Sequence, residues 1–290
     1  MKVLIAGAAG QLARSLVECV PEAVELAVPD EAEFDLMAPE KMREVWARLQ
    51  PDCVINAAAY TAVDLAESEP EAAFAINAEG AARLAELCAA NNARLLHVST
   101  DYVFDGNASR PWKPDDEPRP LGVYGKSKLE GEFRIRERLP EATILRTAWL
   151  YSRHGGNFVK TMLDLLAARD EVAVVSDQVG APTWAGNLAR ILWAFVARPT
   201  AGIFHYTDAG VASWYDFATA IAEEGGTVGL LKEPARVVPT DTASFPRPVP
   251  RPAWSVLDCR STHTHTGIAP EHWRVALRRM LAGMAEEGAK

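Results

Sequence analysis

The sequence has few cysteines and no long uninterrupted apolar run. Its four cysteines include no pair at CxxC spacing, so neither a disulfide framework nor a cysteine-based metal site is indicated. We expect free, buried thiols in a reducing cytoplasm. The apolar run at residues 3–9 is interrupted at Gly7 and soon followed by Arg14, which makes it too short for a signal or membrane segment. The predictions are a cytoplasmic location and no membrane partner.

The chain also lacks an excess of positive charge. Its 30 Lys and Arg are outnumbered by 39 Asp and Glu, which gives a formal net charge of −9. Such a surface repels nucleic acid phosphates, so no nucleic acid partner is expected. A negatively charged substrate must instead meet a local cluster of Arg or Lys. The 290 residues are enough for one large domain or two closely joined ones.

Strand-like and helix-like segments alternate through the first half of the chain. Short apolar strands are expected at residues 2–6, 24–28, 53–58, 95–99 and 143–147, and helices at 12–20, 39–49, 71–91 and 127–138. Nearly continuous apolar strands that alternate with helices indicate a parallel sheet with helices on both faces. The predicted fold is therefore α/β, a doubly wound parallel sheet of the Rossmann type with a smaller C-terminal substrate lobe.

The pattern is looser after about residue 150. Helices are expected at residues 157–168, 187–197, 214–224 and 271–286, strands at 172–175 and 203–206, and Pro-rich loops at 104–122 and 239–252. We expect residues 1–150 to form a dinucleotide-binding domain, with elements returning to it from about 170–200. Residues 151–290 are expected to form mainly a substrate-binding lobe, interleaved with the first domain.

A glycine-rich turn follows the first predicted strand. It reads Gly7-Ala8-Ala9-Gly10-Gln11-Leu12-Ala13 and leads into a helix. Small residues let a backbone approach a pyrophosphate, and the helix N-terminus supplies free N–H groups and partial positive charge. Because the pattern is GxxGxxA and not GxGxxG, a purely structural turn is a competing interpretation. Its position directly after the first strand favours dinucleotide binding.

Acidic residues follow the second predicted strand. Asp30, Glu31 and Asp35 could accept hydrogen bonds from an adenosine ribose, as in NAD sites. No Arg or Lys lies between Arg14 and Lys41 to hold a 2′-phosphate. This pattern favours NADH over NADPH, although a loop can bring in a distant cation. The alternative is that these acids only face solvent.

A tyrosine and a lysine stand four residues apart, at Tyr124 and Lys128, so they share one face of a helix. Reduction of a ketone by hydride requires an acid that protonates the developing alkoxide. A neighbouring ammonium stabilises a phenolate and lowers the pKa of the phenol. The pair is common by chance, but the strand at 95–99 leads into Thr100 at the sheet edge where ligands bind. A hydroxyl there can hold a substrate carbonyl.

These motifs together resemble the dTDP-4-dehydrorhamnose reductases, of the extended short-chain dehydrogenase/reductase family. The resemblance runs in order from residue 1 to about 260. Its segments are the glycine turn and residues 56–64, 99–106, 124–128, 146–151, 177–183 and 251–252. It implies reduction of the C4 keto group of dTDP-4-dehydro-L-rhamnose to dTDP-L-rhamnose by NADH or NADPH.

The resemblance also assigns roles to matching positions. The catalytic trio would be Thr100, Tyr124 and Lys128, with Tyr124 as the proton donor. Substrate contacts would be Thr100, Asp101 and Trp149, whose ring would pack against the sugar. Without the family, Trp149 could equally be a core aromatic. Cofactor contacts would be Gly7, Gly10, Gln11, Leu12, Asp30, Asp35, Leu36, Ala59, Tyr60, Thr61, Val98, Tyr124 and Lys128.

The chain departs from the family pattern at two places. Ala13 stands where many relatives have Gly, so the first helix and strand could be slightly farther apart. Some members bridge a dimer through a metal held by acids after the Gly-Ala-Pro-Thr motif, whereas residues 184–187 here carry no carboxylate. We therefore expect no metal site, and a monomer or a metal-independent dimer. His263 and His265 are expected to be solvated in a loop, not metal ligands.

Other functions remain open from the sequence. The chain could be a reductase or epimerase of another nucleotide-sugar. It could also be a non-catalytic regulatory subunit, as the β subunit of methionine adenosyltransferase is within this fold. Arg247 and Arg251 lie in a Pro-rich stretch and could contact a diphosphate, the C-terminal lobe or only solvent.

Overall fold

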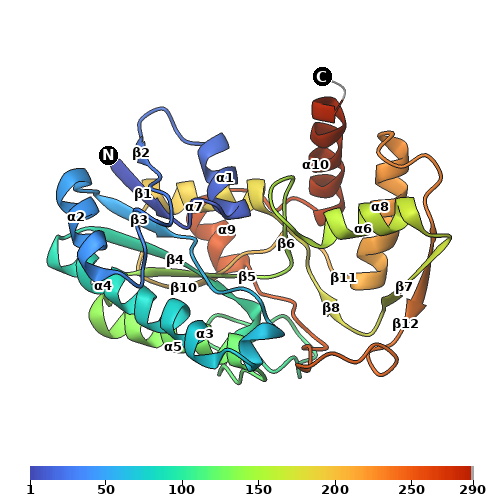
Figure 1. Ribbon diagram of the computed structural model, residues 1–290, viewed down its shortest axis with the longest axis horizontal. Helices are drawn as coiled ribbons and strands as arrows, with labels where there is room; N and C mark the ends of the chain where they lie inside the picture. Colours follow the sequence, from blue (N-terminus) through green and yellow to red (C-terminus); the bar gives the residue numbers. More distant parts are fainter. Residues whose placement is uncertain (289–290) are drawn as a thin grey trace.

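A computed structural model describes residues 1–288. Its centre is a six-stranded parallel sheet with the order β10-β5-β4-β3-β1-β2 (Figure 1). The predicted α/β, doubly wound fold is therefore confirmed. The strands are β1 (Lys2–Ala6), β2 (Glu25–Ala27), β3 (Cys53–Asn56), β4 (Arg94–Thr100), β5 (Thr143–Thr147) and β10 (Gly202–His205).

Helices cover both faces of this sheet because successive side chains of each buried strand point to opposite sides. Val3 and Ile5 of β1 pack towards α1 (Gln11–Glu18) and α7 (Ala185–Ala197). Leu4, between them, packs towards the opposite layer. That layer consists of α2 (Pro39–Leu49), α4 (Ala81–Ala90) and α5 (Val123–Arg138).

The predicted long helix at 71–91 contains a local change of winding. It consists of α3 (Pro70–Phe74), a π-helical segment η2 (Ala75–Gly80) and α4. This segment faces α5 at very short range, since a Cβ on Gly131 would lie 2.1 Å from the carbonyl oxygen of Asn77. Helix α5 begins at Val123, four residues before the predicted start, so Tyr124 and Lys128 are both helical.

A second group of elements surrounds its own hydrophobic cluster, centred on Phe217 and Tyr151 (Figure 1, right). The helices are α6 (Phe158–Ala168), α8 (Trp214–Thr227) and α10 (Trp273–Gly288), and β7 (Glu171–Val175) pairs in parallel with β12 (Arg236–Thr240). Short pairs join β6 (Leu150–Tyr151) to β9 (Thr183–Trp184) and β8 (Val179–Gly180) to β11 (Ala212–Ser213). The domain division at residue 150 remains a prediction.

Two expectations about loops need correction. The Pro-rich loop at 104–122, which we expected to lie on the surface, is partly buried, because Phe104 is buried and stacks on Trp112 with ring centroids 4.6 Å apart. His263 and His265 lie on α9 (Arg260–Thr266), where each ring contacts a backbone carbonyl. Strand β12 and helix α9 were not predicted.

No helix within residues 1–288 is long and apolar enough to cross a membrane.

Candidate active site

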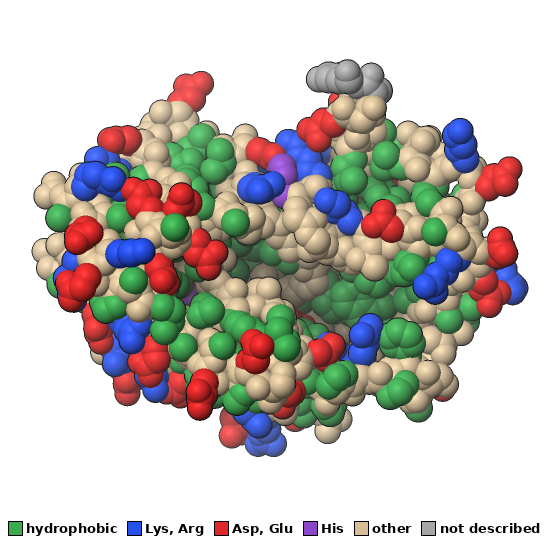
Figure 2. Space-filling model, in the orientation of Figure 1, with side chains coloured by type: hydrophobic (Ala, Val, Ile, Leu, Met, Phe, Trp, Pro, Cys, Tyr) green, Lys and Arg blue, Asp and Glu red, His purple; other side chains and the backbone are tan. Residues whose placement is uncertain are grey.

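A cavity of about 500 Å³ lies at the carboxyl ends of β1, β3, β4 and β5. Figure 2 shows the molecule hollowed near its middle, between the two groups of elements. We call this space the central cavity. It brings together predicted site residues from separate parts of the chain. Those that line it are Gly10, Gln11, Leu12, Ala59, Thr61, Val98, Thr100, Asp101, Tyr124, Lys128 and Trp149.

The glycine turn forms one end of the central cavity. Gly7 has a φ of +90°, and a Cβ there would lie 2.7 Å from the backbone nitrogen of Ala58, so a side chain cannot be accommodated. Gly10 precedes α1, and no side chain caps this helix. The first N–H groups of α1 are therefore available to phosphate oxygens. Ala13 is fully buried against the sheet.

A second, adjoining cavity shares Ala9, Gly10, Ala57 and Ala59 with the first. We call it the side cavity. It would hold the far end of a dinucleotide whose pyrophosphate lies on the glycine turn. Predicted cofactor residues that line it are Gly7, Gly10, Asp35, Leu36 and Ala59, together with Glu31.

Two predicted cofactor residues use their side chains elsewhere. The Asp30 carboxylate accepts a hydrogen bond from the Glu33 backbone N–H at 2.8 Å, which closes a turn. The Tyr60 hydroxyl donates to Glu69 at 2.8 Å. Neither side chain lines either cavity. The motif spacing placed both residues near the cofactor. It does not show that each side chain instead binds a polar partner within nine positions along the chain.

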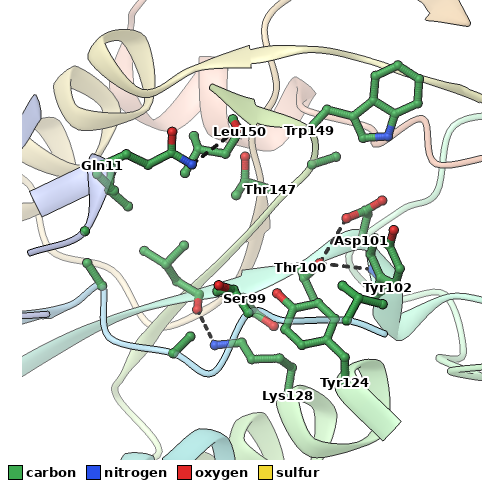
Figure 3. A pocket seen from close by; sticks show the side chains of 18 of the residues that line it. Gln11, Ser99, Thr100, Asp101, Tyr102, Tyr124, Lys128, Thr147, Trp149 and Leu150 are labelled. Carbon is green, nitrogen blue, oxygen red and sulfur yellow. Dashed lines mark hydrogen bonds between the residues drawn. The ribbon is translucent and has the colours of Figure 1, made fainter. Parts of the chain in front are cut away.

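Helix α5 carries Tyr124 and Lys128 into the cavity on one face (Figure 3). The helix can approach the end of β4 because position 125 is Gly, where a Cβ would lie 2.2 Å from the Tyr102 carbonyl oxygen. The Lys128 side chain is buried. Its Nζ donates a hydrogen bond to the Val98 carbonyl at 2.7 Å and lies 3.2 Å from His97 Nε2.

The charge states of the pair follow from their burial. Burial raises the pKa of Tyr124 to about 12, although the Thr100 hydroxyl beside it acts in the opposite direction. Burial lowers the pKa of Lys128 to about 8, opposed by the Glu132 carboxylate. The sequence argument predicted a lowered pKa for Tyr124. In the structure burial has the larger effect, so Tyr124 is a neutral phenol able to donate a proton.

Thr100 and Asp101 lie beside Tyr124 at the end of β4, where η3 (Asp101–Val103) begins. The Thr100 hydroxyl donates to Asp101 at 3.0 Å and accepts from the Tyr102 backbone N–H at 3.2 Å. Burial raises the pKa of Asp101 to about 6. These contacts fix the direction of the Thr100 hydroxyl next to the phenol.

Two further hydroxyls in the cavity were missed as site residues. Ser99 and Thr147 are buried, line the cavity and have no hydrogen-bond partner among the described residues. Buried polar groups are normally paired, so these two fit a ligand with polar atoms. Their signal in the sequence is their position at the carboxyl ends of two parallel strands, β4 and β5.

The opposite wall is aromatic. Trp149 has a φ of +48°, which is unusual for a non-glycine residue. Its ring stacks on Trp214 with centroids 3.6 Å apart and planes 9° apart. Gly180 backs the same ring, since a Cβ there would lie 2.6 Å from it. The indole is thus held at the cavity (Figure 3).

The two arginines left open by the sequence differ in their surroundings. Arg251 pairs with Asp64 at 2.8 Å, and its guanidinium lies 5.9 Å from the ring centroid of Tyr102, which lines the cavity. Arg247 lies over the exposed ring of Phe245 at 4.7 Å. Arg251 is therefore the one placed next to the site.

A Rossmann sheet, a glycine turn and a Tyr–Lys pair that share one cavity define an oxidoreductase of the short-chain dehydrogenase/reductase class. The chain matches the family model "RmlD substrate binding domain" over residues 1–286. It belongs to this family.

Named relatives cover nearly the whole chain. The dTDP-4-dehydrorhamnose reductase of Aggregatibacter actinomycetemcomitans is 40% identical, over 97% of this chain and 98% of the relative. A probable dTDP-4,6-dihydroxy-2-methyloxan-3-one 4-ketoreductase of Streptomyces antibioticus is 44% identical, over 96% and 94%. The crystal structure of Bacillus anthracis dTDP-4-dehydrorhamnose reductase in complex with NADP superposes with a TM-score of 0.92 at 32% identity, over 97% of this chain and 99% of that one.

Proposed function

We propose that this chain reduces the C4 keto group of dTDP-4-dehydro-L-rhamnose to give dTDP-L-rhamnose, with NADH or NADPH as reductant. The observation that carries the proposal is the meeting of Thr100, Tyr124 and Lys128 in a cavity that continues to the glycine turn. The reductases among its relatives support this substrate.

The residues present fit a nicotinamide dinucleotide. The Gly7–Gly10 turn and the uncapped N-terminus of α1 would hold the pyrophosphate. Asp35 and Leu36 would face the adenosine, and Lys128 the nicotinamide ribose. When bound, the cofactor supplies the hydride.

The chain's own residues position the ketone and supply the proton. On substrate binding the Thr100 hydroxyl would exchange its hydrogen bond to Asp101 for one to the carbonyl oxygen, and so hold that oxygen beside Tyr124. The neutral phenol of Tyr124 gives its proton to the oxygen as negative charge develops there. A charged Lys128 stabilises the phenolate that remains. Thr100 and Lys128 are buried, so the low local dielectric strengthens these interactions.

The acidic side cavity favours NADH. Glu31 and Asp35 line it, and their carboxylates would repel a 2′-phosphate. Lys41 and Arg83 do reach this loop, but each donates to a backbone carbonyl, of Ala32 and Leu36 respectively, and neither lines the cavity. We propose that NADH works at least comparably to NADPH. A kcat/KM for NADPH more than ~100-fold above that for NADH, roughly 2.7 kcal/mol, would show this to be wrong.

A second candidate is reduction of a different dTDP-keto sugar, favoured by the 44% identity to the Streptomyces antibioticus ketoreductase. A non-catalytic regulatory role is the other alternative, against which the meeting of Tyr124 and the buried Lys128 in one cavity argues. We also propose a cytoplasmic enzyme, since the cysteines are free, acting as a monomer or metal-independent dimer.

The test is a panel of dTDP-, UDP- and GDP-keto sugars assayed with NADH and NADPH. We expect cofactor oxidation to be fastest with dTDP-4-dehydro-L-rhamnose. Faster turnover of another sugar would favour the second candidate. Binding of NAD(P)H without reduction of any sugar would favour the regulatory role and overturn the proposal.

A further inference from the structure

A buried hydrogen-bonded chain connects the wall of the glycine turn to Lys128. The Ala58 N–H donates to Asn56 Oδ1 at 3.1 Å. Asn56 Nδ2 lies 3.0 Å from His97 Nδ1, and His97 Nε2 lies 3.2 Å from Lys128 Nζ. Asn56, His97 and Lys128 are at most 2% exposed. Solvent therefore cannot compensate for a mismatched donor or acceptor in this chain.

The chemistry of these groups fixes which atom donates and which accepts at each step of the hydrogen-bonded chain. The Ala58 N–H can only donate, so the Asn56 oxygen faces it and the Asn56 amino group faces His97. The imidazole Nδ1 must then accept, which places the proton of neutral His97 on Nε2. A donor N–H is thus aimed at the Nζ of Lys128.

A lysine ammonium is itself only a donor. Facing His97 Nε2–H, it would leave two donors opposed at 3.2 Å. An uncharged amine, in contrast, offers a lone pair to His97 while it still donates to the Val98 carbonyl at 2.7 Å. Every donor and acceptor in the chain is then matched.

The other charged or titratable groups around Lys128 offset this preference for the uncharged amine only weakly. Helix α5 contributes Tyr124 and Glu132, β4 contributes His97, and η3 contributes Asp101, which lies beyond Tyr124. Glu132 is engaged by Arg146 of β5 through two hydrogen bonds, at 2.6 and 2.9 Å. Within residues 1–288, no carboxylate forms an ion pair or hydrogen bond with Lys128.

We propose that His97 is a positioning residue for Lys128: held by Asn56, its Nε2–H favours the uncharged amine and so sets the pH range in which Lys128 carries its charge. The consequence for catalysis rests on the proposed function, in which charged Lys128 stabilises the Tyr124 phenolate. Activity would then fall as pH rises through the pKa of Lys128, about 8.

Two substitutions change, by different means, which atoms donate and which accept in this hydrogen-bonded chain. In His97→Gln the side-chain oxygen can face Nζ and accept from an ammonium. In Asn56→Asp the carboxylate accepts from both Ala58 and His97, which moves the imidazole proton to Nδ1 and leaves Nε2 as an acceptor. Each variant should raise the pKa of Lys128 by about one unit, since a hydrogen bond to the charged form stabilises it.

The direct measurement is an NMR titration of the cofactor-free protein with ¹³Cε-labelled lysine, the Lys128 signal being identified by its loss in Lys128→Met. His205→Gln is the matched control, because His205 is equally buried and lies near Arg146 but does not contact Lys128. We expect the pKa of Lys128 to rise in both chain variants and to stay unchanged in the control. Because no substrate is involved, this result is independent of the proposed reaction.

The kinetic measurement is the alkaline limb of the kcat profile with pH. We expect it to move upward with the NMR value in both variants, whereas a purely structural role would change stability and leave the limb in place. An unchanged pKa of Lys128 in folded His97→Gln and Asn56→Asp would overturn the proposal.

Discussion

The two walls of the central cavity hold their side chains by different kinds of interaction. On the α5 and β4 side, Lys128 and Thr100 are buried polar groups held by hydrogen bonds. On the opposite side, Trp149 is held by stacking on Trp214 and by the lack of a side chain at Gly180. Hydrogen bonds fix proton positions, whereas stacked rings fix a shape. We therefore propose that the first wall transfers the proton and that the second places the sugar.

The largest expected effect comes from the hydroxyl of the first wall. Tyr124→Phe keeps the ring and its packing, so the fold should survive. It removes the proposed acid, and a positioned acid contributes typically ~10²–10⁴-fold. We expect kcat to fall by that order with little change in NADH affinity, measured by single-turnover hydride transfer at saturating cofactor and a thermal melt.

Two further variants show which groups contribute to the loss of activity. Lys128→Met should lower kcat and weaken NADH binding, because it removes both the ammonium and the expected ribose contact. Thr100→Val should have an intermediate effect, as it removes one hydrogen bond to the carbonyl. Hydride transfer at near wild-type rate by folded Tyr124→Phe would exclude Tyr124 as the acid.

The second prediction concerns the stability of the first wall. The pKa of Asp101 is raised from 3.8 to about 6 on folding, so between these values the folded state binds more protons and the free energy of unfolding falls as pH rises. Asp101→Asn removes this dependence. We expect its stability relative to wild type to improve by about 2–3 kcal/mol from pH 4 to pH 8.

Urea denaturation at the two pH values measures this change. Asp105→Asn is the control, because that carboxylate lies in the following loop and accepts from the Asn107 backbone N–H. A difference between Asp101→Asn and wild type that is the same at both pH values would show that burial does not govern the charge of Asp101.

The two walls also differ in how far the sequence could predict them. The alternation of apolar strands and helices was sufficient to predict the sheet. The spacing of Tyr124 and Lys128 was sufficient to predict that they share one face of a helix. The stacking of Trp149 on Trp214 joins residues 65 positions apart through a positive φ, which no local pattern encodes. The His97 contact was missed because a lone His in an apolar strand looks like core.

The third prediction tests the aromatic wall. Trp214→Leu removes the ring beneath Trp149, and stacked aromatic pairs contribute ~0.5–1.5 kcal/mol beyond their burial. We expect KM for the sugar nucleotide to rise roughly 3–10-fold with little change in KM for NADH. Trp214→Phe keeps a stacking partner and should lie near wild type. A loss confined to kcat would mean that this wall takes part in proton transfer.

The smallest expected effect is that of removing metal ions. In the described chain, no group of three or more His, Cys, Asp or Glu is placed to hold a metal ion. After the Gly-Ala-Pro-Thr motif stands Trp184, whose ring centroid lies 5.9 Å from the Arg190 guanidinium and 5.7 Å from that of Arg279. Two cations at this position oppose a divalent ion.

The two carboxylates at this position, Asp208 and Glu271, are already engaged, and Glu271 accepts from the Asn187 amide and pairs with Arg279. Asp208 accepts hydrogen bonds from the Trp184 backbone N–H, the Asn187 amide and the Tyr206 hydroxyl, at 2.9, 2.9 and 3.0 Å. A metal would have to displace these buried contacts and overcome the arginines. We therefore expect EDTA to leave both turnover and the mass in solution unchanged, measured by light scattering before and after chelation. A shift from dimer to monomer on chelation, reversed by restoring the metal, would contradict this and would place a metal-bridged interface beside Trp184.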